Sequence, residues 1–259
     1  MGYPSLRRDS VEPSFDDPAE ERLHRKRQCA LGYRVFAALR WGQLGDGHIS
    51  ARDPERTDHF WLLRYGVPFE RATVDDLVLV APDGSVVDGG PTTRGDEAEI
   101  NDTAYYIHMP IHEARPEIVS AVHTHTGYGT PWAATVEPFR AISQEACSFV
   151  FDQSIFRGEE VNVMDYQTGS RIAEAMGTTR LCFLRNHGLL TVGRSVAEAM
   201  GFYVMAERVA ETHLRAPSAR PISDEAAKSM AEWAERPEVG WVSFQYLVRT
   251  VVPDPSVVG

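Results

Sequence analysis

Three of the nine histidines stand where they could bind one metal ion. His123 and His125 are two residues apart at the end of an apolar run of strand length, and alternation along a strand puts both side chains on one face. His187 stands at a break between two further apolar runs, and Gly188 after it lets the backbone turn. Three neutral imidazoles with an open position form a common catalytic Zn²⁺ site, and imidazole also suits Fe²⁺. From the spacing alone, histidines in this pattern are more often packing or surface residues than metal ligands.

The chain around these histidines alternates between strand-like and helical patterns. A strand over 119–123 would lead directly into the first histidine pair, and turn residues such as Pro82-Asp83-Gly84 separate the earlier apolar runs. Apolar runs of strand length predict further strands at 59–63, 77–81, 85–87, 180–184 and 189–192.

Helix starts are marked by capping residues. Asp17 before Pro18 has the composition of an N-cap followed by proline at the first helical position. Asp96 with Glu99, and Ser195 with Glu198, have capping-box spacing. Neither a GxGxxG nor a GxxxxGK[ST] loop is present in the sequence, so nucleotide-binding folds lack their fingerprint. The predicted helices run from 18 to near Gly42, over 97–114, over 170–176, from 196 to about 214 and over 224–235.

Composition narrows the classes of function. The 259 residues carry 26 basic and 37 acidic side chains, a formal net charge of −11, which makes nucleic acid or an anionic membrane a poor main partner. No apolar stretch approaches the ~20 residues of a membrane span, and the first residues have no apolar signal region. The three cysteines are widely spaced and form no CxxC motif. We therefore expect a protein of the reducing cytoplasm.

The domain organisation predicted from these patterns has three parts. Residues 1–16 form a flexible arm, 17–215 form an α/β domain, and 216–259 form a C-terminal helix and an aromatic tail. The tail is too apolar to remain exposed, so it should pack on the domain or on a neighbouring subunit of a homo-oligomer. Its apolar residues are Trp241, Phe244, Leu247, Val248, Val251 and Val252.

Two segments that contain the histidines are similar to the signatures of a known family. AVHTHTGYGTPWAA at 121–134 and LRNHGLLTVGRSVAEA at 184–199 resemble the two histidine motifs of the class II aldolase/adducin family. The resemblance covers roughly residues 20–215. Three earlier segments fit the family in the same order: GDGHISARDP at 45–54, YGVPFERATVDDLVLV at 65–80 and IHMPIHEARPEIVSAVHTH at 107–125.

The resemblance implies a fold, an assembly and a metal site. The fold is a three-layer α/β/α domain around a central, largely antiparallel sheet, and family members usually assemble as homotetramers with the cleft at a subunit boundary. The family's metal ligands fall on His123, His125 and His187. The cofactor implied is one divalent ion, Zn²⁺ or Fe²⁺, with Mn²⁺ as a further candidate.

The sequence departs from the sugar-phosphate aldolases of this family at the catalytic acid. In those enzymes a glutamate stands four residues before the helix histidine, and counting back from His108 gives Ala104. Alanine can neither transfer a proton nor bind a metal. Glu145, between the metal strand and the next helix, and His48 are therefore candidate replacements for the catalytic acid or base.

The positions that match the family's phosphate pocket are also changed. They read His48, Tyr65-Gly66 and Asp102-Thr103, and Asp102 would repel a phosphate dianion. A small carboxylic or oxo acid is therefore the expected substrate. We expect Asn186 to fix the turn before His187. The substrate-binding candidates are Tyr65, Gly66, Asp102, Thr103, Gln144 and Asn186.

Four functions remain open on the sequence. The first is a metal-dependent lyase that breaks a C–C bond beside a carbonyl. The second is a non-heme Fe²⁺ oxygenase, because the resemblance extends to aminocoumarin-pathway enzymes that oxidatively decarboxylate an aryl 2-oxo acid. The third is a non-catalytic scaffold like adducin, and the fourth is an epimerase or dehydratase. The retained histidines favour the enzymes over the scaffold.

Overall fold

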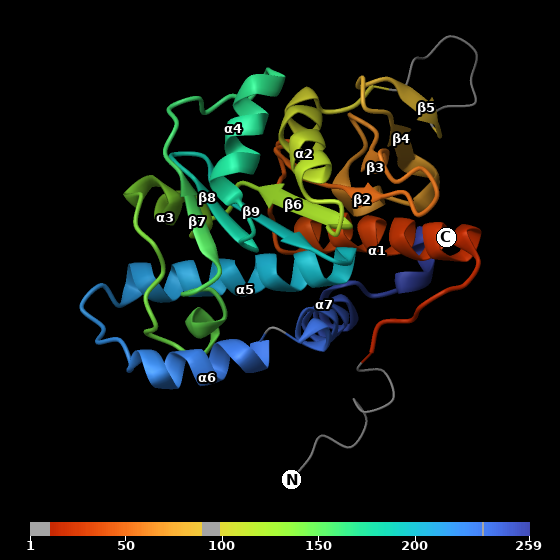
Figure 1. Cartoon of the computed structure of the whole chain (residues 1–259). Coiled ribbons are helices and arrows are strands. Elements are labelled where there is room, and N and C mark those ends of the chain that lie inside the picture. Colours follow the sequence, from red (N-terminus) through yellow and green to blue (C-terminus); the bar gives the residue numbers. More distant parts are fainter. Residues whose placement is uncertain (1–10, 90–98, 235) are drawn as a thin grey trace.

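The computed structural model of the chain describes residues 11–89, 99–234 and 236–259 (Figure 1). The elements are arranged around a five-stranded sheet in the order β1-β6-β9-β8-β7. These strands are Gly47–Ile49, Ser120–Thr124, Gly188–Gly193, Leu181–Leu184 and Gln153–Phe156. All neighbours pair antiparallel except β7 and β8, which are parallel. The predicted central, largely antiparallel sheet is confirmed.

A second sheet of four antiparallel strands extends from the first. Its order is β2-β3-β4-β5, and its strands are Ala51–Arg52, Phe60–Leu63, Leu77–Val80 and Val86–Asp88. The chain passes from β1 to β2 through Ser50, so the two sheets are joined directly. The strands predicted from the apolar runs at 59–63, 77–81 and 85–87 are thus present.

Helices cover both faces of the large sheet. Helix α2 (Asp102–Ala114) and helix α4 (Tyr166–Met176) lie on one face, and α1 (Pro18–Ala38), α5 (Val196–Arg215) and α7 (Pro237–Val251) lie on the other (Figure 1). Two buried apolar clusters fill the spaces between the layers. The three-layer α/β/α arrangement is confirmed. The shorter elements are α3 (Gly129–Thr135), α6 (Asp224–Ala234), η1 (Phe69–Arg71), η2 (Val74–Asp76), η3 (Glu145–Ser148) and η4 (Pro255–Val258).

Two of the predicted helix caps form as expected. The carboxylate of Asp17 accepts a hydrogen bond from the backbone N–H of Ala19 at 2.9 Å. The hydroxyl of Ser195 accepts from the backbone N–H of Glu198 at 3.0 Å, and the Glu198 carboxylate accepts from the N–H of Arg194 at 2.6 Å. Both caps satisfy N–H groups that have no partner within the helix. Local sequence therefore fixed the start of α1 and of α5.

Three predicted helix boundaries were wrong. Helix α2 begins at Asp102 with Asn101 as its N-cap, while Glu99 is not helical and the predicted cap residue Asp96 lies outside the described residues. Helix α1 ends at Ala38 rather than near Gly42, because Arg40 adopts a left-handed backbone conformation with φ of 61°.

The third boundary concerns a glycine that is part of a helix. Helix α4 begins at Tyr166, so Gly169 lies inside it instead of preceding it. A Cβ at Gly169 would lie 1.8 Å from the carbonyl oxygen of Tyr106 in α2. Glycine is present here because the two helices touch at their backbones, and it does not end the helix.

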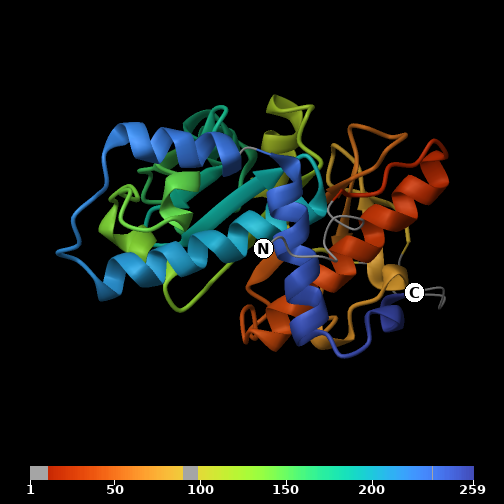
Figure 2. The same cartoon turned by 90° about the horizontal axis from the view of Figure 1, so that it is seen from below.

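The apolar tail folds as helix α7 and packs on its own chain. Trp241, Phe244 and Val248 are buried in the cluster that also contains α1 and α5. Figure 2 shows α7 crossing both α5 and α1, and it contacts both helices. A Cβ at Gly201 would lie 2.3 Å from the carbonyl oxygen of Gly240, so the α5–α7 crossing requires glycine. Burial of the tail within the chain means that its apolar composition does not require a second subunit.

Among the described residues, none of the helices combines the length and the hydropathy that a bilayer-spanning segment needs.

Asp53 connects α1 to the second sheet. Its fully buried carboxylate accepts hydrogen bonds from Nε of Arg22 at 2.6 Å, from Nε1 of Trp61 at 3.0 Å and from the backbone N–H of Arg56 at 2.8 Å. Burial alone would raise the pKa of Asp53, but these donors, Arg22 first, hold that pKa well below its ordinary value. The charged form is therefore the one that stabilises the fold.

We predict that Asp53→Asn lowers the free energy of unfolding by about 2 kcal/mol at pH 7, because a charge-assisted hydrogen bond to a buried group is lost. Since the folded-state pKa is depressed, the carboxylate's contribution is complete above the unfolded-state pKa of about 3.9 and disappears as pH falls towards the folded-state value. Urea unfolding of both proteins checks this. The difference in free energy of unfolding between the two proteins should be constant from pH 7 to pH 5 and should shrink below pH 4. A difference that grows in acid would contradict the depressed pKa of Asp53.

Candidate metal centre

The structure brings His123, His125 and His187 together. His123 lies on β6, His125 directly follows that strand, and His187 lies in the turn between β8 and β9. The rings of His123 and His187 are 4.6 Å apart between centroids, and those of His125 and His187 are 5.0 Å apart. One nitrogen from each ring lies within 4.8 Å of the others. This is close enough for all three to bind one cation.

The turn that carries His187 follows from its own sequence. Asn186 has a left-handed backbone with φ of 55°, a conformation that asparagine tolerates better than most residues. The backbone N–H of His187 donates to the carbonyl of Leu184 at 3.0 Å and closes the turn. The Asn186 side chain is exposed and is not part of the described cavity wall. Asn186 thus sets the turn, as expected, and the structure does not support it as a substrate contact.

Burial keeps two of the three histidines, His123 and His187, in the neutral form that metal binding requires. His123 donates from Nδ1 to the carbonyl oxygen of Leu189 at 2.7 Å, which leaves Nε2 as the ligand atom. Burial lowers the pKa of His123 well below its ordinary value. Burial, with the nearby His125, lowers the pKa of His187 to about 4. Nδ1 of His125 lies 3.2 Å from the Asp46 carboxylate, which can orient that ring. Neutral imidazoles with oriented rings fit a divalent ion.

A buried glutamate that the sequence analysis missed holds the loop after His125. The Glu207 carboxylate on α5 accepts hydrogen bonds from the Thr126 hydroxyl at 2.6 Å and from the N–H groups of Tyr128 and Gly129 at 2.9 and 2.6 Å. Burial raises the pKa of Glu207 above its ordinary value, and the three hydrogen-bond donors offset only part of this rise. Glu207 therefore caps the start of α3 and fixes the loop. The sequence did contain a signal for this role, because Glu207 falls on the buried face of the helix predicted over 196–214.

A cavity of about 840 Å³ opens onto the three histidines. The predicted substrate residues Tyr65, Asp102 and Thr103 line it, and Gly66 lines an adjoining cavity. Asn101, the N-cap of α2, is also part of the wall and was not anticipated. The family's phosphate-pocket positions therefore do converge beside the histidines.

His48 lies next to this cluster and is paired with a second histidine. It stands opposite His123 in the β1–β6 register, with ring centroids 4.9 Å apart. Its Nδ1 is 2.7 Å from Nε2 of His108 in α2. Burial lowers the pKa of both His48 and His108 well below the ordinary value, so both are neutral and one donates to the other. His112, one turn along α2, instead bonds to the Ser50 hydroxyl at 2.8 Å.

The structure does not bring Gln144 and Glu145 to the histidines, which corrects the prediction of Glu145 as catalytic and Gln144 as substrate-binding. Both belong to the η3 region, where Glu145 lies 3.7 Å from Arg208 of α5 and Gln144 contacts α6. Neither is among the described residues of the cavity wall. The cause is the buried ring of Phe149, which packs 6.1 Å from that of Phe202 and anchors η3 on α5.

Known proteins have sequences similar to most of this chain. The profile of the Class II Aldolase and Adducin N-terminal domain family matches residues 27–214. The chain is 32% identical over 240 residues to "4-hydroxy-3-prenylphenylpyruvate oxygenase/4-hydroxy-3-prenylbenzoate synthase" of Streptomyces roseochromogenus subsp. oscitans, covering 91% of this chain and 84% of that protein. It is 33% identical to "Decarboxylase NovR" of Streptomyces niveus, covering 91% and 86%.

A solved structure has the same fold over nearly the whole chain. It is that of L-fuculose 1-phosphate aldolase from Glaciozyma antarctica PI12, with a TM-score of 0.83 and 28% identity. The match covers 95% of this chain and 96% of that one.

We predict that His123→Ala, His125→Ala and His187→Ala each abolish most of the bound divalent metal, because each removes one of three ligands. Asp46→Asn should weaken binding by about 10- to 100-fold, since it removes only the group that orients His125. Metal content after gel filtration and titration of the apoprotein measure both effects. His59→Ala, on the loop before β3, is the control. Full metal occupancy in all three ligand variants would show that the ion binds elsewhere.

Proposed function

Because the chain belongs to the class II aldolase and adducin family, we propose that it is a metal-dependent enzyme that cleaves a C–C bond beside the carbonyl of a non-phosphorylated oxo or hydroxy acid. The convergence of three imidazoles on one point, two of them kept neutral by burial, is the observation that supports this most directly. A scaffold has no use for such a cluster, whose burial costs desolvation energy.

The charge of the cavity supports a substrate without phosphate. Asp46, Glu99 and Asp102 all line it, and no described arginine or lysine does. A phosphate dianion would meet three carboxylates there. A carboxylate or carbonyl oxygen bound directly to the metal needs no separate anion pocket.

Oxidative decarboxylation of a 2-oxo acid is the form of the reaction that we propose first. Two similar proteins carry the names oxygenase and decarboxylase. Ala104 supplies no proton donor at the position where sugar-phosphate aldolases have a glutamate, and a reaction driven by O₂ does not need one there. When bound, Fe²⁺ would supply the Lewis acidity and the redox chemistry that the side chains lack, and imidazole is a suitable ligand for it.

The protein's own residues bind and orient the substrate. His48 lines the cavity and is held by His108 through its Nδ1, so its Nε2 is the atom left for a hydrogen bond with the substrate. The Thr103 hydroxyl, in the first turn of α2, donates to Oδ1 of Asn101 at 2.6 Å, so its oxygen is left as an acceptor towards the cavity. Glu207 keeps the loop after His125 in place without touching the cavity.

A non-oxidative lyase that uses Zn²⁺ or Mn²⁺ is the second candidate. The match in fold to an aldolase structure favours it. Since Glu145 lies elsewhere, the proton would have to come from His48, from a tyrosine such as Tyr65, or from water.

We predict that protein purified without oxygen contains iron and takes up O₂ when a 2-oxo acid is added, releasing CO₂ from its carboxyl group. Elemental analysis, an oxygen electrode and ¹³CO₂ detection measure this over a panel of 2-oxo and 2-hydroxy acids, with His187→Ala as the inactive control. Zinc or manganese with O₂-independent cleavage would replace the oxygenase by the lyase. Absence of any metal would overturn both and support the scaffold.

We also propose that the protein is a homotetramer. Val161 and Met164 line the histidine cavity and are 51% and 47% exposed. Tyr166, which is 40% exposed, follows them in the sequence, and exposed apolar side chains of this kind would suit a subunit contact. Light scattering at micromolar concentration should give a mass near four times 28.9 kDa. A monomeric mass with full activity would exclude a site completed by a neighbour.

A further inference from the structure

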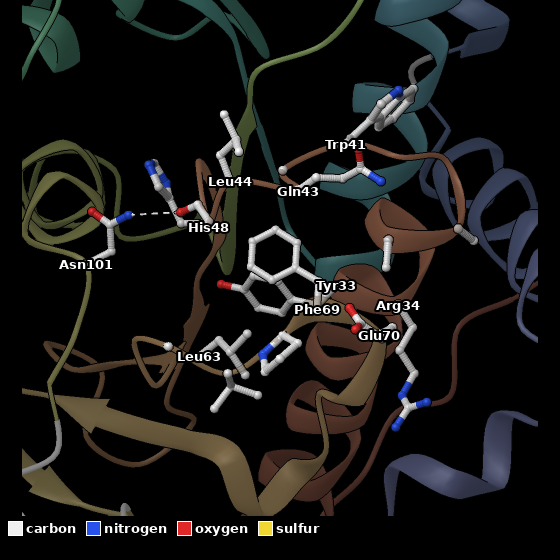
Figure 3. Close-up of a pocket in the computed structure, with 18 of the residues that line it drawn as sticks. Tyr33, Arg34, Trp41, Gln43, Leu44, His48, Leu63, Phe69, Glu70 and Asn101 are labelled. Atoms are coloured by element: carbon white, nitrogen blue, oxygen red, sulfur yellow. Dashed lines mark hydrogen bonds between the residues drawn. The ribbon is translucent and has the colours of Figure 1, made fainter.

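A second cavity, of about 800 Å³, adjoins the histidine cavity. It lies between the end of α1, the end of β3 with the loop that follows, and the last residues of α7. The two cavities share the wall residues Leu44, Gly45, His48, Tyr65 and Asn101. A hydrogen bond from Nδ2 of Asn101 to the carbonyl of Gly45, at 3.5 Å, crosses this common wall (Figure 3). The second cavity therefore directly adjoins the site through a shared wall.

The wall of this cavity is aromatic and held in place. Figure 3 shows the rings of Tyr33 and Phe69 in its centre, with Leu63 beside them and Trp41 across from His48. The Tyr33 and Phe69 rings are 4.9 Å apart between centroids. The Tyr33 hydroxyl accepts a hydrogen bond from the Ile49 N–H at 2.9 Å, which fixes that ring. Preformed aromatic cavities of this size are typical sites for small ligands with apolar parts.

Ala104, at the position of the aldolase acid, lies in the wall of the second cavity. It lies on α2, is 1% exposed, and belongs to the wall of the second cavity together with His48. Since only a methyl group is present, any longer side chain at 104 would occupy space in the cavity. The alanine at the position of the aldolase acid therefore also leaves room in the second cavity, beside His48.

We propose that the second cavity binds the aromatic or bulky apolar tail of the substrate, while the oxo-acid end lies among His123, His125 and His187. This rests on the proposed function and narrows it: the substrate is an arylpyruvate-type 2-oxo acid, and a short one such as pyruvate fills only half the site. His48, present in both walls, lies where the two halves of such a molecule meet.

The test compares phenylpyruvate with pyruvate as probes. Calorimetry on the metal-loaded protein without oxygen measures binding, and kcat/KM in air measures turnover. The wild type should bind phenylpyruvate at least about 10-fold more tightly, a difference of about 1.4 kcal/mol. Ala37→Phe fills the cavity from α1 without contacting the histidines, and Val67→Trp fills it from the loop after β3. Ala134→Phe, at an exposed position of α3, is the matched control.

In the two filled variants the preference for phenylpyruvate should fall to near 1, with pyruvate binding within about 2-fold of the wild type and the control unchanged. Two filling positions are used so that a variant that fails to fold can be replaced by the other, with thermal unfolding as the check. If wild type and filled variants bind both acids equally, only this inference fails. If the wild type binds and converts neither acid, the proposed function fails with it.

Discussion

The antiparallel pairing of β6 with β9 is the constraint on which the candidate site depends. The register places His123 opposite Leu190 and Thr124 opposite Leu189, so the turn before β9 lies against the end of β6. A shift of one residue would move the His123 side chain to the opposite face of the sheet. The carbonyl of Leu189, which accepts the hydrogen bond from His123, belongs to the same ladder. Strand pairing therefore sets both the position and the tautomer of a ligand.

Burial by the surrounding layers makes the histidine cluster suited to a metal. Packing of the layers above and below the sheet removes water from His123 and His48, which keeps these imidazoles uncharged. Uncharged rings can lie within 5 Å of one another without repulsion. The fold also buries carboxyl groups elsewhere, at Asp53 and Glu207, and in both cases several donors surround the group.

The parts that could be predicted from the sequence are those that local chemistry determines. The N-cap Asp17, the turn at Asn186 and the HxH strand end act through neighbours within a few residues. The position of Glu145 could not be predicted, because it depends on the contact between Phe149 and Phe202, which are 53 positions apart. Gly169 was read as a helix boundary because a contact between two helices leaves no local mark. The cavity beside the site likewise combines segments from three distant regions.

The close crossing of α5 and α7 at Gly201 and Gly240 also determines which residues line the second cavity. It fixes a helix from the end of the sequence so that Val251 and Val252 form part of a wall whose other side comes from α1, near the beginning. The three histidines, by contrast, come from the middle of the chain. On the function proposed above, the histidines would set the reactivity, and the two ends of the chain would contribute to the choice of substrate. Changes confined to those ends would then alter which acids are accepted while the histidine cluster stays the same.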